Sequence, residues 1–204
     1  MSTSKQMNQT KQVDRVEGTA IPLRGSNIDT DRIIPARFLK SITFEGLGEH
    51  AFEDDRQSIP NHPFANSAFR AASILLVNEN FGSGSSREHA PQSLKRWGIR
   101  ACVGESFSDI FKSNTLAIGL PCATATADDI EFLMAIAEQV PSTTMEFRVE
   151  TLVLQAADRS VILDIPPGIR ESLLTGQWDA TGLLLDRFNE VRTVAAGLPY
   201  VKGF

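Results

Sequence analysis

The stretch NFGSGSSREHAP, residues 80–91, lies between a short apolar run and a segment whose apolar residues recur at helical spacing. Residues 73–77 before it are typical of a buried strand, and Ala90, Leu94 and Trp97 after its start fall on one helical face. The stretch is therefore predicted to be a glycine-containing loop that leads from a strand into a helix.

Such a loop is suited to binding an anion. Its glycines allow the backbone to approach a ligand, and the free N–H groups at the start of a helix attract carboxylate or phosphate. Ser85, Ser86 and Arg87 add two hydroxyls and a cation at the same place. The alternative is structural, because Ser85 and Glu88 fit a capping box, although Pro91 must then lie in the first helical turn. Neither the phosphate-loop pattern GxxxxGK[ST] nor the nucleophile-elbow pattern GxSxG occurs here.

A second run, NIDTDRIIP at residues 27–35, follows a predicted strand at residues 15–23. Asp and Thr side chains readily bond to backbone N–H groups two or three positions ahead. The structural interpretation of this run is therefore an Asx turn that caps Ile33 and Ile34.

Length and composition predict one globular domain. The chain has 204 residues, 42% of them hydrophobic, and a formal net charge of -5. An acidic balance argues against nucleic-acid binding, and no apolar run is long enough for a membrane helix. Residues 1–14 are predicted to be a disordered tail and 15–204 the domain. The tail lacks the apolar core of a signal peptide, so a cytoplasmic location is expected.

The two cysteines do not suggest a metal site. Cys102 and Cys122 each lie in an apolar, strand-like run, where cysteine usually behaves as a small buried hydrophobe. Iron–sulfur clusters normally need three or four thiolates. We therefore expect no metal in this chain and no structural disulfide.

The remaining patterns interleave strands and helices. We predict strands at 99–103 and 120–123, a hairpin of 145–154 with 160–165, a helical turn at 35–40, an irregular segment at 41–70, and helices at 109–117, 128–139, 166–176 and 181–195. This order indicates an α/β fold with a mixed sheet covered by helices.

Residues 80–91 and 27–35, together with the run at 106–111 and Asn114, resemble the swivelling domain of the aconitase family. The nearest form is the separate small subunit of bacterial 3-isopropylmalate dehydratases, and the resemblance covers most of residues 15–190. It implies the swivelling β/β/α fold, a partly open barrel-like mixed sheet with flanking helices.

The resemblance also implies a reaction. The family's small subunit acts with a large subunit that holds a [4Fe-4S] cluster, and the pair isomerises 2-isopropylmalate to 3-isopropylmalate in leucine biosynthesis. The substrate is a hydroxy-dicarboxylate. Two alternatives stay open: a related hydro-lyase acting on homoaconitate, citraconate or a methylated malate, and a non-catalytic anion-binding module.

Site roles follow from the resemblance by position. Ser85 matches the catalytic serine, Ser86 and Arg87 are expected to bind substrate carboxylate, and the loop Asp29, Thr30 and Asp31 is expected to order the site. Specificity is assigned to apolar candidates beside that loop, Ile34, Phe38 and Leu39. The chain departs from the family in one place. A basic Thr-Arg-Thr-Gly is common in the family at residues 43–46, where this chain has Phe44 and Glu45 in the middle two positions. The change favours an apolar ligand group.

Overall fold

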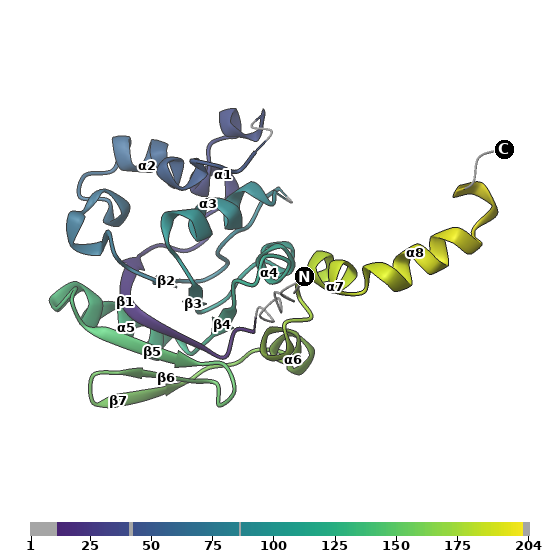
Figure 1. Cartoon of the computed structure of the whole chain (residues 1–204). Coiled ribbons are helices and arrows are strands. Elements are labelled where there is room, and N and C mark those ends of the chain that lie inside the picture. The colour runs from purple at the N-terminus through teal and green to yellow at the C-terminus, as the bar shows by residue number, and fades with distance from the viewer. Residues whose placement is uncertain (1–11, 41–42, 86, 202–204) are drawn as a thin grey trace, which may run out of the picture.

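The computed structural model describes residues 12–40, 43–85 and 87–201. Figure 1 shows a body of one sheet with helices around it, from which a C-terminal helical arm extends. Most of the predicted tail lies outside the described residues. Its last two residues are tied to the body, since the Val13 N–H donates to the Leu173 carbonyl at 2.9 Å and the Asp14 carbonyl accepts from Val149 N at 2.8 Å.

The sheet has seven strands in the order β4-β3-β2-β1-β5-β6-β7. Strands β1 to β4 are parallel neighbours, whereas β5 to β7 form an antiparallel meander. The bounds are β1 Arg15–Leu23, β2 Ile74–Val77, β3 Ala101–Gly104, β4 Cys122–Thr124, β5 Thr144–Arg148, β6 Val153–Ala156 and β7 Arg159–Ile162.

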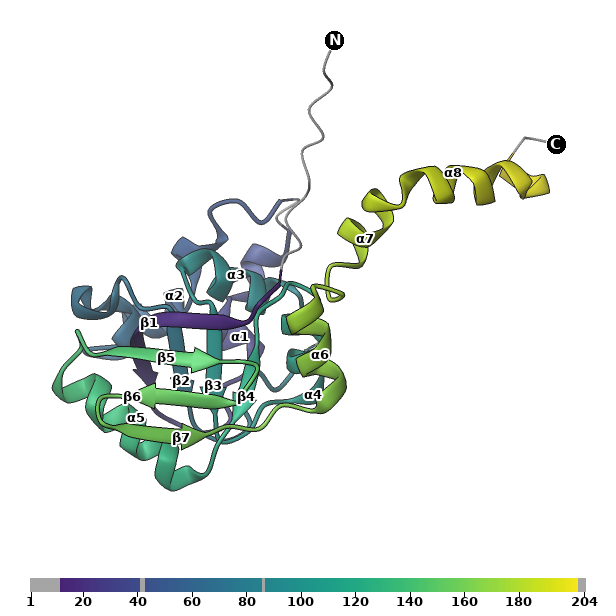
Figure 2. The ribbon, with the colours of Figure 1, turned by 60° about the horizontal axis from the view of Figure 1, so that its bottom comes forward.

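Strand β1 joins the two halves of the sheet. Its first part pairs with β5 and its second part, from Ala20, pairs with β2. Gly18 lies in the first part with φ 154°, and a Cβ there would stand 2.1 Å from Ser73 Oγ. Figure 2 shows β5 to β7 running across the direction of β2 to β4, so the sheet is curved like part of a barrel. This is the partly open mixed sheet that the sequence predicts.

Two apolar cores fill the two sides of the sheet. Successive strand residues face opposite sides, so Leu75 and Cys102 belong to one core and Ile74 and Val103 to the other. The described helices are α1 Thr30–Ile33, α2 Glu53–Ser58, α3 His89–Trp97, α4 Asp109–Leu116, α5 Ala127–Gln139, α6 Pro167–Thr175, α7 Ala180–Asp186 and α8 Phe188–Gly197.

Three sequence expectations are wrong. The long strand predicted at 145–154 is two strands, β5 and β6, because the chain turns at 149–152 with Leu152 at φ 55°. The single last helix is two helices, α7 and α8, which meet at Arg187. The described part of segment 41–70 is not irregular: it contains α2 and 3-10 helices at Leu47–His50, Pro63–Ala65 and Ser67–Phe69.

Buried apolar residues hold that segment to the body. Leu47, Phe52 and Phe64 lie in the same core as β2 and α3. The Phe52 N–H donates to the Ile33 carbonyl at 2.8 Å, which attaches α2 to the end of α1. The segment is therefore part of the packed body where the structure describes it.

His62 gives this packing a pH dependence. The ring is buried between Phe52 and Phe64, and its Nδ1 accepts from Phe64 N at 3.2 Å. Burial lowers the pKa of His62 below its ordinary value of 6.5. The unfolded chain therefore binds a proton near pH 6.5 that the folded chain resists, so stability from this site is full above that pH and declines below it.

We predict that His62→Asn lessens the loss of stability as the pH falls below about 6.5. Asparagine keeps the acceptor for Phe64 N, as Asn66 does for Ala68 N at 2.9 Å in the next turn. Denaturant unfolding of both proteins at a series of pH values measures the difference. Parallel pH profiles for the two proteins would contradict the assignment.

Candidate active site

The loop after β2 has the backbone that its glycines allow. Asn80, Gly82 and Gly84 have φ values of 54°, 75° and 94°. A Cβ on Gly82 would lie 2.3 Å from the Phe111 ring, so no larger residue fits there without displacement of that ring. The Ser108 hydroxyl donates to the Gly82 carbonyl at 2.6 Å and also caps α4. The loop is thus fixed from the side of α4.

The second motif lies directly against this loop. Asp29 and Ser83 form a parallel β-bridge, and Thr30 N donates to the Ser83 carbonyl at 2.9 Å. The buried Thr30 hydroxyl donates to the Ser85 carbonyl at 3.3 Å. The two runs, about 50 residues apart in the chain, therefore form one structural unit.

Charge joins the same two segments. Arg87 NH1 forms an ion pair with Asp31 Oδ1. The arginine side chain is partly buried, whereas the aspartate is more than half exposed. Ser85, two residues before Arg87 in the chain, is exposed. An incoming carboxylate can compete with Asp31 for Arg87.

The capping box that Ser85 and Glu88 could form is absent. Helix α3 begins at His89 with Glu88 as its N-cap, so Pro91 lies in the first helical turn, and among the described residues no side chain caps the helix. Glu88 instead accepts from Gln92 Nε2 at 2.8 Å. The Asx cap at the other motif is present, since Asp29 Oδ1 accepts from Arg32 N at 2.9 Å. Ser85 is therefore free of the helix-capping role, and Ser86 lies outside the described residues.

The specificity candidates differ in accessibility. Ile34 is fully buried and belongs to the core. The Phe38 ring stacks on His50 with centroids 4.0 Å apart, and Leu39 is partly exposed. Leu39 and the outer part of Phe38 are the candidates that a ligand can reach.

Two contacts near the site were not predicted. The Arg32 guanidinium bonds to the buried Asp55 carboxylate, with Nε to Oδ2 at 2.9 Å, and so links α1 to α2. The Phe44 ring meets His89 edge to face at 5.1 Å and lies under Arg96 at 5.2 Å. Phe44 is therefore held against α3. No local sequence signal pairs residues so far apart.

The described residues fit an iron–sulfur cluster poorly. Within them no three His, Cys, Asp or Glu side chains come together as metal ligands. Cys102 and Cys122 are register partners in β3 and β4, and both thiols are buried and free. A hydrogen bond with Cys122 and burial raise the pKa of Cys102, which disfavours the thiolate that a metal needs.

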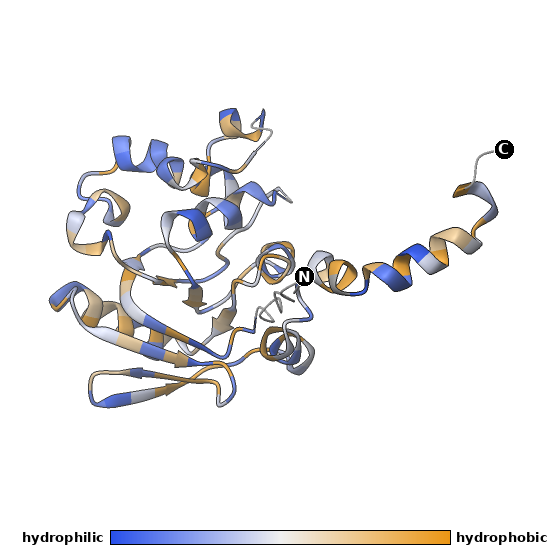
Figure 3. Cartoon of the chain, in the orientation of Figure 1, coloured by the Kyte–Doolittle hydropathy of each residue, from blue (hydrophilic) through white to orange (hydrophobic). Residues whose placement is uncertain are grey.

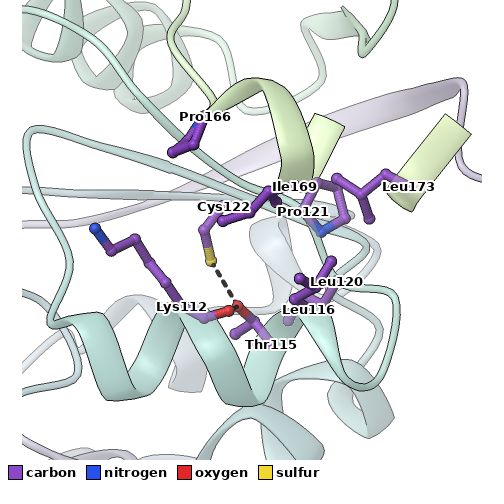
Figure 4. A pocket seen from close by; sticks show the side chains of 9 residues that line it. All are labelled: Lys112, Thr115, Leu116, Leu120, Pro121, Cys122, Pro166, Ile169 and Leu173. Carbon is purple, nitrogen blue, oxygen red and sulfur yellow. Dashed lines mark hydrogen bonds between the residues drawn. The ribbon is translucent and has the colours of Figure 1, made fainter. Parts of the chain in front are cut away.

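Figure 4 shows the surroundings of Cys122, a small cavity between α4 and α6. The thiol donates to the Thr115 hydroxyl at 3.3 Å. The other lining residues are mainly apolar, among them Leu116, Leu120 and Leu173. No predicted site residue lines this cavity, so it is part of the packing and not of the active site.

Comparison with known proteins agrees with this geometry. The family model described as Aconitase C-terminal domain matches residues 10–125. The chain is 47% identical over 191 residues to the 3-isopropylmalate dehydratase small subunit of Synechocystis sp., covering 93% of this chain and 96% of that one. It is 45% identical over 189 residues to that of Thermus thermophilus, covering 91% and 94%.

A solved structure shares the fold. The crystal structure of 3-isopropylmalate dehydratase from Methanocaldococcus jannaschii superposes with a TM-score of 0.64 at 23% identity, covering 85% of this chain and 98% of that chain. The chain therefore belongs to the aconitase C-terminal domain family, and the predicted swivelling-domain fold is confirmed. Its place in that family is among the small subunits of 3-isopropylmalate dehydratase, a hydro-lyase. A small subunit implies a larger partner chain.

Within the described residues, no helix is both long enough and apolar enough to cross a bilayer. This finding concerns the helices alone.

Proposed function

We propose that this chain supplies the base and the carboxylate clamp of an active site that it shares with a large subunit. The pair converts 2-isopropylmalate to 3-isopropylmalate, a step of leucine biosynthesis. One observation carries the proposal: the loop of Asp29, Thr30 and Asp31 is bonded to the glycine loop and leaves Ser85 exposed beside Arg87.

The chemistry assigns a role to each group. Moving the hydroxyl to the adjacent carbon requires loss of a C–H proton and of hydroxide, followed by addition of water in the opposite sense. Ser85 Oγ, as alkoxide, takes the C–H proton and later returns it. An alkoxide needs strong stabilisation at neutral pH, and we assign this stabilisation to the loop N–H groups, the start of α3 and Arg87. Arg87 binds a substrate carboxylate in place of Asp31, and Ser86 donates to the same carboxylate.

The departing hydroxide needs a Lewis acid, which we assign to a [4Fe-4S] cluster in the large subunit. The poor fit of this chain's own residues to a cluster supports that assignment. We place the complex in the cytoplasm, where the neighbouring thiols Cys102 and Cys122 stay reduced.

Arg87 offers a test of the clamp. Arg87→Lys keeps the charge but loses the two-pronged geometry, so we expect kcat/KM to fall by about 30-fold or more, mainly through a higher KM. Asp31→Asn is the matched variant on the partner residue and should disturb KM less, because it leaves the guanidinium available to the substrate. Steady-state kinetics of both reconstituted complexes measure this. A KM for Arg87→Lys equal to the wild-type value would remove Arg87 from substrate binding.

Specificity provides the test of the proposed function itself. We expect the complex to prefer isopropylmalate over citrate and homocitrate, because Leu39 and Phe38 are apolar and Phe44 is packed against α3. A hydrophobic contact of this kind is worth only about 1 to 3 kcal/mol, so Leu39→Arg should move the preference towards tricarboxylates. Anaerobic kcat/KM values on a panel of hydroxy-diacids decide the matter. A wild-type preference for a tricarboxylate would favour the related hydro-lyases, and no turnover of any member would favour a binding module.

A further inference from the structure

The arm, residues 180–201, consists of α7, α8 and a 3-10 helix at Pro199–Val201. Figures 1 and 2 both show α8 standing clear of the body. No residue of α8 is buried. The second core ends one element earlier, at Leu173 and the partly buried Trp178. The body is therefore packed without the arm.

The arm nevertheless carries most of the exposed large apolar side chains. Among the described residues twelve such side chains are exposed, and eight of them lie between Leu183 and Val201. The other four are scattered over the body, at Ile59, Ile110, Val140 and Ile162. Figure 3 shows apolar and polar positions alternating along α7 and α8. Such a concentration marks a contact surface.

Some of these apolar positions form a stripe. A shallow groove on the arm is lined by the apolar residues Leu184, Val191, Val194, Ala195 and Leu198, and by the charged residues Arg187 and Glu190. This spacing of three and four residues is that of a helix that lays one face into an apolar groove or against another helix. Asn189 and Thr193 lie on the opposite face of α8.

The base of the arm is fixed. The Trp178 ring packs on Gly119, where a Cβ would lie 2.4 Å from the ring, and Lys95 Nζ lies 5.4 Å from the ring centroid. Asp179 caps α7 by accepting from Gly182 N at 2.9 Å. The arm therefore begins at a defined place on the body, which lowers the entropy cost of presenting it to a partner.

The charge of the arm argues for a protein partner. Residues 180–201 contain two acidic and two basic residues, so the arm has no net charge. Binding to phosphates or to an anionic lipid surface relies on clustered lysines and arginines, which are missing from this sequence. Burial of the apolar stripe is the available driving force.

The comparisons indicate which protein the arm contacts. The match with the Synechocystis small subunit covers 93% of this chain, so the part that it leaves out is shorter than the arm. At least part of the arm thus belongs to the sequence that this chain shares with another small subunit. Since a small subunit must hold a larger chain, and the body offers no comparable apolar surface among its described residues, the arm is the fitting contact.

We propose that the arm docks by its apolar stripe, centred on Val191 and Val194, into an apolar groove of the large subunit and holds the two chains together. This rests on the proposed function only for the existence of the large subunit. It assigns the arm a role in assembly, separate from the groups that act on substrate.

The test is the affinity of the full-length chain for the large subunit, measured anaerobically by calorimetry without substrate. Val191→Asp with Val194→Asp places two charges on the stripe, and we expect Kd to rise by roughly 100-fold or more. The control, Asn189→Asp with Thr193→Asp, adds the same charge to the opposite face and should bind like wild type. Neither pair touches the packed body, so both proteins should unfold like the wild-type chain.

Two results would overturn the proposal. One is an unchanged Kd for the stripe variant. The other is a combination of three findings: the wild-type chain alone is a dimer, the stripe variant alone is a monomer, and both bind the large subunit with equal affinity. The stripe would then contact a second copy of this chain and not the large subunit. At saturating large subunit the stripe variant should recover wild-type kcat. If the wild-type complex assembles but turns over no substrate, the proposed function fails while the docking result stands.

Discussion

Ser85→Ala is expected to lower kcat of the reconstituted enzyme by about 1000-fold or more, with KM within a few-fold of wild type. Loss of a positioned general base lowers the rate about 10²- to 10⁴-fold. The Ser85 alkoxide, in addition, exists only if the loop stabilises its charge. Binding should survive because Arg87, the proposed carboxylate clamp, is unchanged. Since Ser85 caps no helix, alanine should cost less than the roughly 1 kcal/mol of a lost cap.

Ser83→Ala is the matched control in the same loop. Its bonds to the second motif run through the backbone, to Thr30 N and across the bridge to Asp29, and alanine preserves them. We expect near wild-type turnover for this variant. Turnover of Ser85→Ala close to that of Ser83→Ala would show that Ser85 is only a surface residue of the loop.

The elements that the sequence predicts well are those set by local patterns. Strand β1 and helices α5 and α6 end where expected, within a residue or two, since buried apolar spacing and the Thr126 and Gly176 caps define them. The glycine loop also lies between strand and helix as expected. Pro91 must lie in the first helical turn, and regular helix accordingly starts at His89, which leaves no capping box for Ser85 and Glu88.

Other features depend on contacts that no local pattern encodes. The turn between β5 and β6 has Leu152 at φ 55°. Leucine rarely adopts a positive φ, so the sequence does not predict a turn there. The pairing of Arg87 with Asp31 spans 56 residues, and that of Arg32 with Asp55 spans 23. The sequence placed Asp29 to Asp31 at the site only through family resemblance, whereas the structure bonds them to the loop. Ile34 is a candidate for substrate contact by its place just after the Asp29 to Asp31 loop, yet it lies in the core.

The second large expected effect is that catalytic activity depends on the partner chain. Ser85 and Arg87 hold and deprotonate substrate in this account, but hydroxide departure needs a Lewis acid that the described residues are poorly suited to bind. The purified chain should therefore contain no stoichiometric iron or acid-labile sulfide and should give no turnover. A cluster-bearing large subunit alone would lack the proposed base, so we expect it to be inactive as well.

The most direct measurement is anaerobic turnover of 2-isopropylmalate by this chain, by its large subunit, and by the two mixed in equal amounts. We expect no turnover by either chain and full activity in the mixture, saturating at one small subunit per large subunit. Turnover by the large subunit alone at the rate of the mixture, or by this chain alone together with bound iron, would contradict it.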